Sequence, residues 1–431
     1  MMTNYYLKTR VYELFPSKTM KAVLDRNCDY RRYCWNQALA LWNDLYFAHQ
    51  IYDKIRYTTF TPKENKKTHQ IKIIKKDVHL NPSPSWRLVR DKLVEDKEDW
   101  QFNYSAHLLQ LAVQDLGKAW NNFFDKAQPD WGKPRFKSKR EVRQGFKSDQ
   151  AKVINGELVL EKPKGLKQEW EAIGLSEKPL DYPTGVMSIY RESGRYFVSI
   201  PYKIPKNEFK AKASTGRVTG VDLNVGHFNY IAGDERILPQ KLEYTYEKIK
   251  HYQRLLARKR KVNGRKESTK SNNYLKTRTK LQVAYKRATN NQNDLLQKFT
   301  AKLTNDYDAI VVENLDVKKM MMSHVASKGM HRSMFGKFRQ IIAYKCKWYG
   351  RELIIANSLY PSTQRCAVCG TVKKGEDKIT LKGNKKHGTK NNEFICYNSK
   401  CPNYNQKVDR DENAMLNLTM LVEHPELNKA L

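Results

Sequence analysis

The first quarter of the chain has the apolar spacing of one strand followed by helices. Residues 5–14 alternate weakly between apolar and polar side chains, which indicates a strand. A helix is predicted next at about 17–47, and the polar stretch 50–85 shows no clear period. Helical spacing resumes near residue 86 and is clearest at about 105–125, where large apolar side chains recur every three or four residues. We therefore expect a helical region after the first strand.

Residues 144–205 contain the short alternating runs of a β domain. The segments 186–190 and 196–202 lie on either side of Gly194 and predict a β-hairpin. Together with the first strand, these pieces suggest a small barrel. The helical segment 17–127 would then be an insertion after the first strand of that barrel.

From about residue 216 the pattern changes to that of an α/β domain. Segments 218–223 and 228–232 predict paired strands around a turn at Gly226, and a long helical hairpin is expected at 241–305. The run 309–313 is almost entirely apolar, which is typical of a buried parallel strand. Three later elements complete the prediction: a helix at about 333–349, a strand at 352–356 and a final helix at about 411–423. The predicted fold class is a multidomain α+β and α/β protein.

The charge of the chain points to a polyanionic partner. Its 431 residues include 80 Lys and Arg against 45 Asp and Glu, a formal net charge of +35. Such an excess repels itself in the compact state unless a polyanion neutralises it, and phosphate neutralisation drives binding to nucleic acid. An anionic membrane surface is the alternative, but the sequence has no apolar run long enough to span a bilayer and no lipidation signal. We therefore expect nucleic acid as a partner and no membrane.

The N-terminus and the cysteines indicate a cytosolic protein. The first residues lack the apolar segment of a secretory signal. Four of the seven cysteines have metal-binding spacing, whereas Cys28, Cys34 and Cys346 are scattered. This usage fits a reducing compartment with a metal site better than a disulfide framework. We expect the three scattered cysteines to be ordinary buried thiols.

Two basic segments are candidates for contact with nucleic acid. The loop 131–140 interleaves Lys and Arg with aromatic side chains, which suits phosphate contact combined with stacking; a solvated linker is the alternative. Residues 241–290 hold 16 Lys or Arg against 3 Glu, whereas a solvated helix face usually mixes both signs. The candidate contact residues are Lys133, Arg135, Phe136, Lys137, Lys139, Arg258, Lys259 and Arg260.

Three isolated carboxylates stand where a metal site could be built. Asp222 lies near the end of a predicted strand, Glu313 ends a buried strand, and Asp411 begins the last helix. Taken singly, each has an ordinary alternative as a turn residue or a helix-start charge. A buried carboxylate is costly unless it is paired, however, and hard cations such as Mg²⁺ or Mn²⁺ take oxygen ligands. Together, the order Asp, Glu, Asp across strand, strand and helix predicts a two-metal, RNase H-type or RuvC-type nuclease site. Asp409 competes for the third position, and Asp411 is preferred because it opens the helix.

Four cysteines predict a second, structural metal site. Cys366 and Cys369 form a C-x₂-C pair, and Cys396 and Cys401 form a C-x₄-C pair. Four thiolates without an open ligand position describe a closed Zn²⁺ site. His387 lies between the two pairs and is not expected to be a ligand. The intervening loop 370–395 is rich in Lys and Gly, and we expect it to project as a mobile flap.

These motifs, in this order, resemble the TnpB (OrfB) family of insertion-sequence-encoded, RNA-guided DNA endonucleases, to which the compact type V CRISPR effectors are related. The resemblance covers most of residues 128–423. The motifs that carry it are the segments 132–139, 220–223, 312–315, 348–353, 360–370 and 409–414. The second cysteine pair departs from the family pattern, in which C-x₂-C is usual.

The resemblance implies a fold and a set of site residues. A wedge-type β-barrel would comprise residues 1–16 and 128–215, with a helical recognition domain at 17–127. A RuvC-like, RNase H-like nuclease domain would comprise 216–365 and 403–431, with a zinc-ribbon insert at 366–402. The family's catalytic triad falls on Asp222, Glu313 and Asp411, which would bind Mg²⁺ or Mn²⁺. Its structural Zn²⁺ ligands fall on Cys366, Cys369, Cys396 and Cys401.

The resemblance also implies partners and a location. A transposon-derived guide RNA would pair with target double-stranded DNA, while the protein supplies charge, shape and the reading of a short adjacent motif. A monomer in the prokaryotic cytosol, associated with the nucleoid, is favoured. A compact type V CRISPR effector is the nearest alternative, and a transposase and a guide-directed repressor without nuclease activity are further ones.

Overall fold

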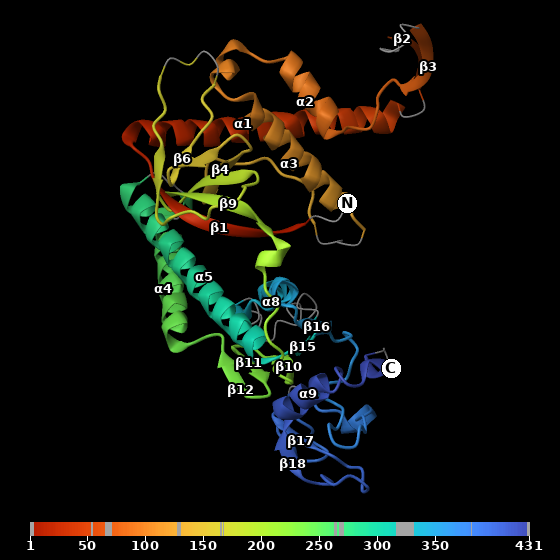
Figure 1. The fold of residues 1–431 in the computed structure, drawn as a ribbon. Helices are drawn as coiled ribbons and strands as arrows, with labels where there is room; N and C mark the ends of the chain where they lie inside the picture. The colour runs from red at the N-terminus through yellow and green to blue at the C-terminus, as the bar shows by residue number, and fades with distance from the viewer. Residues whose placement is uncertain are drawn as a thin grey trace. The chain divides into compact units, whose positions relative to one another are not determined.

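The chain divides into two compact units in the computed structural model, Met1–Pro205 and Lys206–Leu431 (Figure 1). The structure describes residues 4–52, 55–64, 71–126, 131–163, 166, 168–262, 265–266, 271–315, 332–380 and 382–428. Among these residues, none of the helices combines the length and the apolar character that crossing a bilayer would require. The finer division into four domains stays a prediction.

A seven-stranded antiparallel sheet forms the centre of the first unit. Its order is β4-β8-β9-β1-β7-β6-β5. The strands are β1 (Tyr5–Phe15), β4 (Arg143–Ser148), β5 (Lys152–Ile154), β6 (Glu157–Val159), β7 (Ile173–Leu175), β8 (Met187–Glu192) and β9 (Arg195–Pro205). Buried and partly exposed residues alternate along most of β9, so one face of the sheet packs against the core. The predicted first strand and the predicted hairpin, which is β8–β9, are both confirmed.

Three helices accompany this sheet: α1 (Lys18–Tyr52), α2 (Trp86–Glu95) and α3 (Ala106–Phe124). Side-chain oxygens of Ser85 and Ser105 accept backbone N–H groups at the starts of α2 and α3, which fixes where these helices begin. The apolar stripe predicted for 105–125 is buried in α3. Its Trp120 stacks on Trp42 of α1 with ring centroids 5.9 Å apart. The helical insertion therefore has its own apolar contact between α1 and α3.

A hairpin formed by β2 (Arg56–Glu64) and β3 (Ile71–His79) was not predicted. Large apolar side chains of this hairpin are exposed, with Phe60 and Ile73 both 66% accessible. Because neither face of the hairpin is buried, the sequence lacks the apolar alternation that reveals a strand. The stretch 50–85 therefore has no clear period that would predict these two strands.

A five-stranded mixed sheet organises the second unit. Its order is β12-β11-β10-β15-β16, with antiparallel pairing among the first three strands and parallel pairing from β10 to β16. The strands are β10 (Val218–Leu223), β11 (His227–Tyr230), β12 (Gly233–Arg236), β15 (Ala309–Val312) and β16 (Glu352–Ile355). Gly226, with φ of +93°, makes the predicted turn between β10 and β11.

Helices pack on both faces of this sheet. α5 (Asn272–Asp306) and α8 (Phe335–Tyr349) lie on one face and α9 (Arg410–Thr419) on the other, whereas α4 (Gln240–Lys259) packs against α5. Ile310 and Val312 of β15 lie in one apolar cluster with residues of α5 and α8, whereas Val311 packs with Leu418 of α9 on the other face. Burial on both faces explains why the predicted strand read as one continuous apolar run. The remaining strands are β13 (Lys261–Val262), β14 (Arg265–Lys266), β17 (Glu393–Ile395) and β18 (Lys407–Asp409).

The segment between the two cysteine pairs folds back and does not project. Phe394 is 1% exposed and Ile379 is 8% exposed, and both pack against the cysteines. The expectation of a projecting flap was therefore wrong: its few apolar residues form a small core around the sulfur atoms.

Candidate active site and metal centre

Asp222 lies next to the end of β10 and is only 4% exposed. Asn224, just beyond the strand, donates a hydrogen bond from its Nδ2 to Oδ2 of Asp222 at 2.8 Å. This contact orients the buried carboxylate but does not neutralise its charge.

Glu313 follows β15 directly and lies beside Asp222. Val221 and Val312 are paired in the parallel β10–β15 ladder, so the next residue of each strand reaches the same sheet edge. The Ser362 hydroxyl donates to Glu313 Oε1 at 2.7 Å. The parallel pairing therefore brings together two carboxylates that are about ninety positions apart in the sequence.

Burial and like charge act together on these two groups. Burial, with the negative charges of Glu313 and Asp411 added to it, raises the pKa of Asp222 well above its usual value. Burial likewise raises the pKa of Glu313. Two adjacent buried carboxylates are costly without a counter-charge, and a hard cation with oxygen ligands would remove that cost. The donor set therefore fits a divalent cation.

Asp411 is the second residue of α9, and the structure separates it from its competitor. The Asp409 carboxylate caps the helix, accepting the N–H groups of Asp411 at 2.9 Å and Glu412 at 3.0 Å. The Asp411 carboxylate instead accepts a hydrogen bond from Arg410 Nη2 at 3.0 Å and lies 4.0 Å from His227 Nε2. Asp409 is thus occupied by the helix end, while Asp411 belongs with the other two carboxylates electrostatically.

A close approach of α9 to β10 sets the position of Asp411. A Cβ added to Gly220 would lie 2.5 Å from the Met415 carbonyl oxygen and 2.6 Å from Leu418 Cβ. The Gly220 N–H donates to Thr419 Oγ1 at 2.7 Å. Only glycine allows the helix backbone to lie this close to the strand. The position of Gly220 two residues before Asp222 therefore has a packing reason.

Two asparagines of α9 hold the segment that carries Ser362. Asn417, which is fully buried, donates from Nδ2 to the carbonyls of Ser362 at 3.0 Å and Arg365 at 2.7 Å. Asn413 donates to the Arg365 carbonyl at 2.8 Å and accepts the Ala367 N–H at 3.0 Å. Sequence reasoning missed Ser362, Asn224 and Asn417 as site residues. The spacing of Asn413 and Asn417 on one helix face was the available signal.

The four predicted cysteines converge. Their sulfur atoms all lie within 4.8 Å of one another, and all four are free thiols. Among the described residues, this is the one set of His, Cys, Asp or Glu side chains whose ligand atoms meet that limit. Cys366, Cys396 and Cys401 are buried, and burial raises the pKa of the Cys396 thiol to about 12. His387 stacks on Tyr397 and its Nε2 lies 2.7 Å from Asp377 Oδ1, away from the cluster's ligand set.

An open cleft of about 270 Å³ borders the carboxylates. It is lined by Asp222 and Glu313 together with polar groups that include Asn314, Asn357, Ser362 and Arg410. A polar cleft lined by buried acids suits a charged substrate better than an apolar one.

The predicted nucleic-acid contacts fall into two groups. Lys133, Arg135, Phe136 and Lys139 are exposed, while Lys137 is half-buried. Arg258, Lys259 and Arg260 are exposed at the end of α4, and Lys259 Nζ donates to Thr277 Oγ1 of α5 at 2.8 Å. Their contact with nucleic acid stays a prediction.

Two protein-family models match this chain, and both matches lie largely within the second unit. Residues 199–324 match the OrfB_IS605 family, described as "Probable transposase". Residues 335–418 match the family described as "Cas12f1-like, TNB domain". The second match contains the last carboxylate and all four cysteines of the cluster.

Several curated proteins are similar to this chain. A Streptomyces pristinaespiralis protein named "Putative RNA-guided DNA endonuclease" is 27% identical over 272 residues, covering 62% of this chain and 63% of that protein. "Putative RNA-guided DNA endonuclease InsQ" of Escherichia coli K12 is 26% identical over 300 residues, covering 63% and 67%. "TnpB-like protein L79" of Acanthamoeba polyphaga mimivirus is 22% identical over 260 residues, covering 56% and 44%.

The aligned part of the chain therefore spans between 44% and 67% of the length of these relatives. A solved structure, "Cryo-EM structure of the Cas12f1-sgRNA-target DNA complex", aligns over 96% of this chain and 99% of that chain, with 14% identity and a TM-score of 0.32. That score is too low to support an argument about the fold. The resemblance to the TnpB (OrfB) family is nevertheless confirmed by the family models and the curated relatives.

Proposed function

We propose that this protein is an RNA-guided, divalent-metal-dependent DNA endonuclease of the TnpB type. The observation that carries the proposal is the pair of buried, adjacent carboxylates Asp222 and Glu313, with Asp411 of α9 close enough to affect both electrostatically. The sheet order β12-β11-β10-β15-β16, with the acids at neighbouring parallel strands and on a helix against them, is the arrangement expected of an RNase H-like or RuvC-like domain.

In this proposal the three carboxylates hold Mg²⁺ or Mn²⁺. When bound, two such ions would stabilise the attacking and leaving oxygens of a phosphodiester displacement. Asn224 and Ser362 orient the carboxylates of Asp222 and Glu313 by donating hydrogen bonds to them. Arg410, which lines the cleft beside Asp411, would contact the phosphate backbone of the bound strand.

The four cysteines would hold a structural Zn²⁺. A closed four-thiolate site leaves no position for substrate, so its contribution is to stability. It would anchor the chain at Cys366, directly after the segment that Asn413 and Asn417 tie to α9. In this way the zinc site would support the position of Ser362 and of α9 beside the carboxylates.

The partners follow from the relatives and the charge. The curated relatives are named as RNA-guided DNA endonucleases, and the net charge of +35 suits an RNA and a DNA strand together. The β sheet of the first unit and its helices would serve as the wedge and recognition parts, and the basic loop 133–139 with the end of α4 would contact nucleic acid. A transposon end or a repeat array beside the gene would separate a transposon nuclease from a CRISPR effector.

The first test is to purify the protein expressed from its native locus and to sequence the RNA that co-purifies. A single discrete RNA ending in a variable segment supports guidance and supplies the target for a cleavage assay. Heterogeneous RNA, or none, would favour a guide-independent nuclease or a transposase that uses the same carboxylates.

The second test uses that target. Asp222→Asn should lower Mg²⁺-dependent cleavage on the order of a thousandfold or more while RNA binding is retained, because the change removes a metal ligand but keeps the shape of the side chain. Asp234→Asn is the matched control, since Asp234 is an exposed aspartate on β12 of the same unit. Normal cleavage by Asp222→Asn would refute the assignment of the site.

A further inference from the structure

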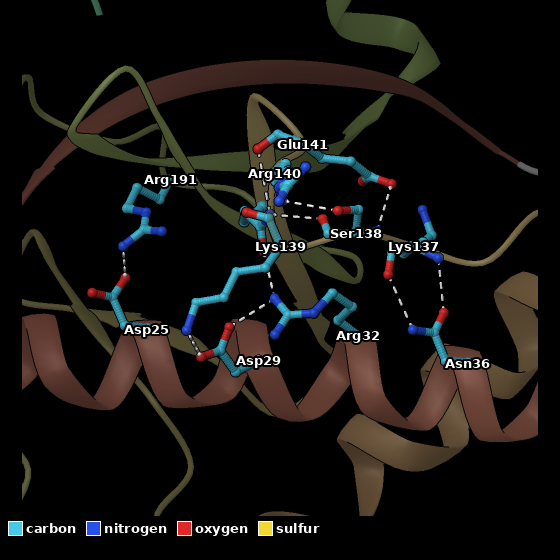
Figure 2. Close-up of polar contacts among 11 residues, drawn as sticks. Asp25, Asp29, Arg32, Asn36, Lys137, Ser138, Lys139, Arg140, Glu141 and Arg191 are labelled. Carbon is cyan, nitrogen blue, oxygen red and sulfur yellow. Dashed lines mark hydrogen bonds and ion pairs between the residues drawn. The ribbon is translucent and has the colours of Figure 1, made fainter. Parts of the chain in front are cut away.

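The basic loop that follows the helical insertion is held against α1 by a built set of contacts. Asp25, Asp29, Arg32 and Asn36 recur along α1 at helical spacing and so share one face of the helix (Figure 2). Figure 2 shows Asp29, Arg32 and Asn36 directed toward the loop residues 137–141, whereas Asp25 pairs with Arg191 of β8. We call residues 133–141 the basic strap.

Asn36 fixes the backbone of the strap at Lys137. Its Oδ1 accepts the Lys137 N–H at 2.8 Å, and its Nδ2 donates to the Lys137 carbonyl at 3.0 Å (Figure 2). Two residues earlier in the strap, Trp35 Nε1 donates to the Arg135 carbonyl at 2.9 Å. Phe136 therefore lies between two backbone groups that are anchored to α1, the Arg135 carbonyl and the Lys137 N–H.

Gln144 anchors the far end of the strap. This side chain is 8% exposed, and its Nε2 donates to the carbonyls of Lys139 at 2.9 Å and Ser138 at 3.2 Å. Its Oε1 accepts a hydrogen bond from Arg32 Nη1 at 2.8 Å. Buried polar contacts of this kind specify one backbone conformation, because leaving any of the groups unpaired would be costly.

The side chains of the strap differ in what they can offer to a partner. Lys137 Nζ lies 4.5 Å from the centre of the Trp35 ring, and burial, together with the charge of Arg31, lowers the pKa of Lys137. Lys139 Nζ lies 3.5 Å from Asp29 Oδ2. By contrast, Phe136 is 60% exposed and Arg135 is exposed as well. The strap thus uses Lys137 in packing on α1 and presents Arg135 and Phe136 to solvent.

We propose that Arg135 and Phe136 form a binding site for single-stranded nucleic acid, in which Phe136 stacks on an unpaired base and Arg135 contacts a backbone phosphate. This inference rests on the proposed function, which supplies unpaired RNA or DNA. The face of a base is open to an aromatic ring only where the base is unpaired, and stacking of this kind tolerates any sequence. Asn36 is the positioning residue, since it holds the backbone beside Phe136 before the strand arrives and so avoids an ordering cost on binding.

The test measures binding of short labelled strands to the full-length chain after co-purifying RNA has been removed. The probes are oligo(U) RNA, oligo(dT) DNA and a blunt DNA duplex of the same length, titrated by fluorescence anisotropy at several KCl concentrations. Phe136→Ala should weaken binding to the single strands about tenfold and leave duplex binding unchanged. Its effect should be independent of salt, because no charge is removed. Phe47→Ala is the matched control, since Phe47 is a 65% exposed phenylalanine on α1.

Arg135→Gln should act differently from Phe136→Ala. Removing one phosphate contact should reduce the slope of log K against log salt by about 0.7 on single strands. The two single-stranded probes tell the sources apart: a larger loss on oligo(U) assigns the site to RNA, and a larger loss on oligo(dT) assigns it to a DNA strand. Either result supports a single-strand site.

Asn36→Ala tests the positioning role. It should weaken single-strand binding with an unchanged salt slope and abolish the slow hydrogen exchange of the Lys137 amide. Asn36→Asp keeps the acceptor for that amide and should restore part of both. A purely structural role would instead lower the melting temperature and leave the affinity of the folded protein unchanged.

Three results would overturn the inference. Equal losses on single strands and duplex for Phe136→Ala would show that the ring does not stack on unpaired bases, and no loss on any probe would show that it does not bind. In both cases the proposed nuclease function would stand, because wild-type binding is intact. Absence of wild-type binding to every probe would instead contradict the inference and the proposed function together.

Discussion

Asp308 joins three parts of the second unit through one carboxylate. It accepts the N–H groups of Thr215 at 2.9 Å and Gly216 at 2.8 Å, and the Ser214 hydroxyl at 2.5 Å. Arg351 Nη1 lies 2.5 Å away, and this guanidinium is almost fully buried. These groups precede β10, β15 and β16, so Asp308 ties together the amino ends of the three parallel strands whose other ends carry the candidate site.

The pH dependence of stability should report on this carboxylate. The hydrogen bond from Ser214, followed by that from the Thr215 backbone, holds the pKa of Asp308 well below its usual value. A depressed folded-state pKa contributes stability above the unfolded pKa of about 4, and that contribution is lost as pH falls below it. Asp308→Asn should therefore lower the melting temperature at pH 7, and the gap to wild type should narrow as the pH falls below about 4. Circular dichroism melts at several pH values measure this; a gap that is constant with pH would contradict it.

At the scale of elements, Gly220 is where α9 meets β10. Gly220→Ala should cost about 1–3 kcal/mol of unfolding free energy, because the new methyl group would meet helix backbone and not a flexible side-chain end. It should also reduce cleavage, since α9 carries Asp411. Gly336→Ala in α8 is the control, because a Cβ there meets nothing within 4 Å. That control should gain about 0.5 kcal/mol as a helical Gly-to-Ala change. Urea unfolding of both variants decides, and equal effects would rule out the packing explanation.

The cysteine cluster should bind one zinc ion per chain and hold α9 through the segment that follows Ser362. Cys396→Ser should release the zinc, measured by elemental analysis, and speed hydrogen exchange of the α9 amides, because Asn413 and Asn417 would lose a fixed partner segment. Cys346→Ala, at a buried thiol outside the cluster, should keep the zinc. Wild-type protein that contains no zinc when purified without chelators would refute this.

An element could be predicted from the sequence where it has one dominant buried face or a continuous buried run. The strand at β15 and the helix α3 were predictable because their apolar residues are contiguous or follow the helical period. The hairpin β2–β3 was missed because its apolar residues are exposed on both faces. At the site, the carboxylates and cysteines could be chosen by residue type and motif. Ser362 could not, because its role follows from the fold of the segment that Asn417 holds.

At the scale of the whole molecule, the net charge of +35 should limit the stability of the free protein. Several of its ion pairs are exposed, such as Lys298 with Asp294 and Lys386 with Glu376. Exposed pairs each contribute at most about 1 kcal/mol to stability. Salt that screens them therefore removes less stability than it adds by screening the repulsion among the excess Lys and Arg side chains. Raising KCl from about 50 to about 200 mM should therefore raise the melting temperature of the RNA-free chain.

The stabilisation that an added oligonucleotide provides should have the opposite salt dependence and should fall as KCl rises. Binding to the folded state alone stabilises it by about 2.7 kcal/mol at a ligand concentration one hundred times Kd. Because counterion release weakens that binding as salt rises, the oligonucleotide should raise the melting temperature strongly at low KCl and progressively less at higher KCl. The melting temperatures measured with and without oligonucleotide should therefore approach each other as the KCl concentration rises. If salt instead lowered the melting temperature of the free chain, attractive ion pairs would outweigh the repulsion. The excess of Lys and Arg would then not destabilise the free protein, and nucleic acid would not stabilise it by neutralising that charge.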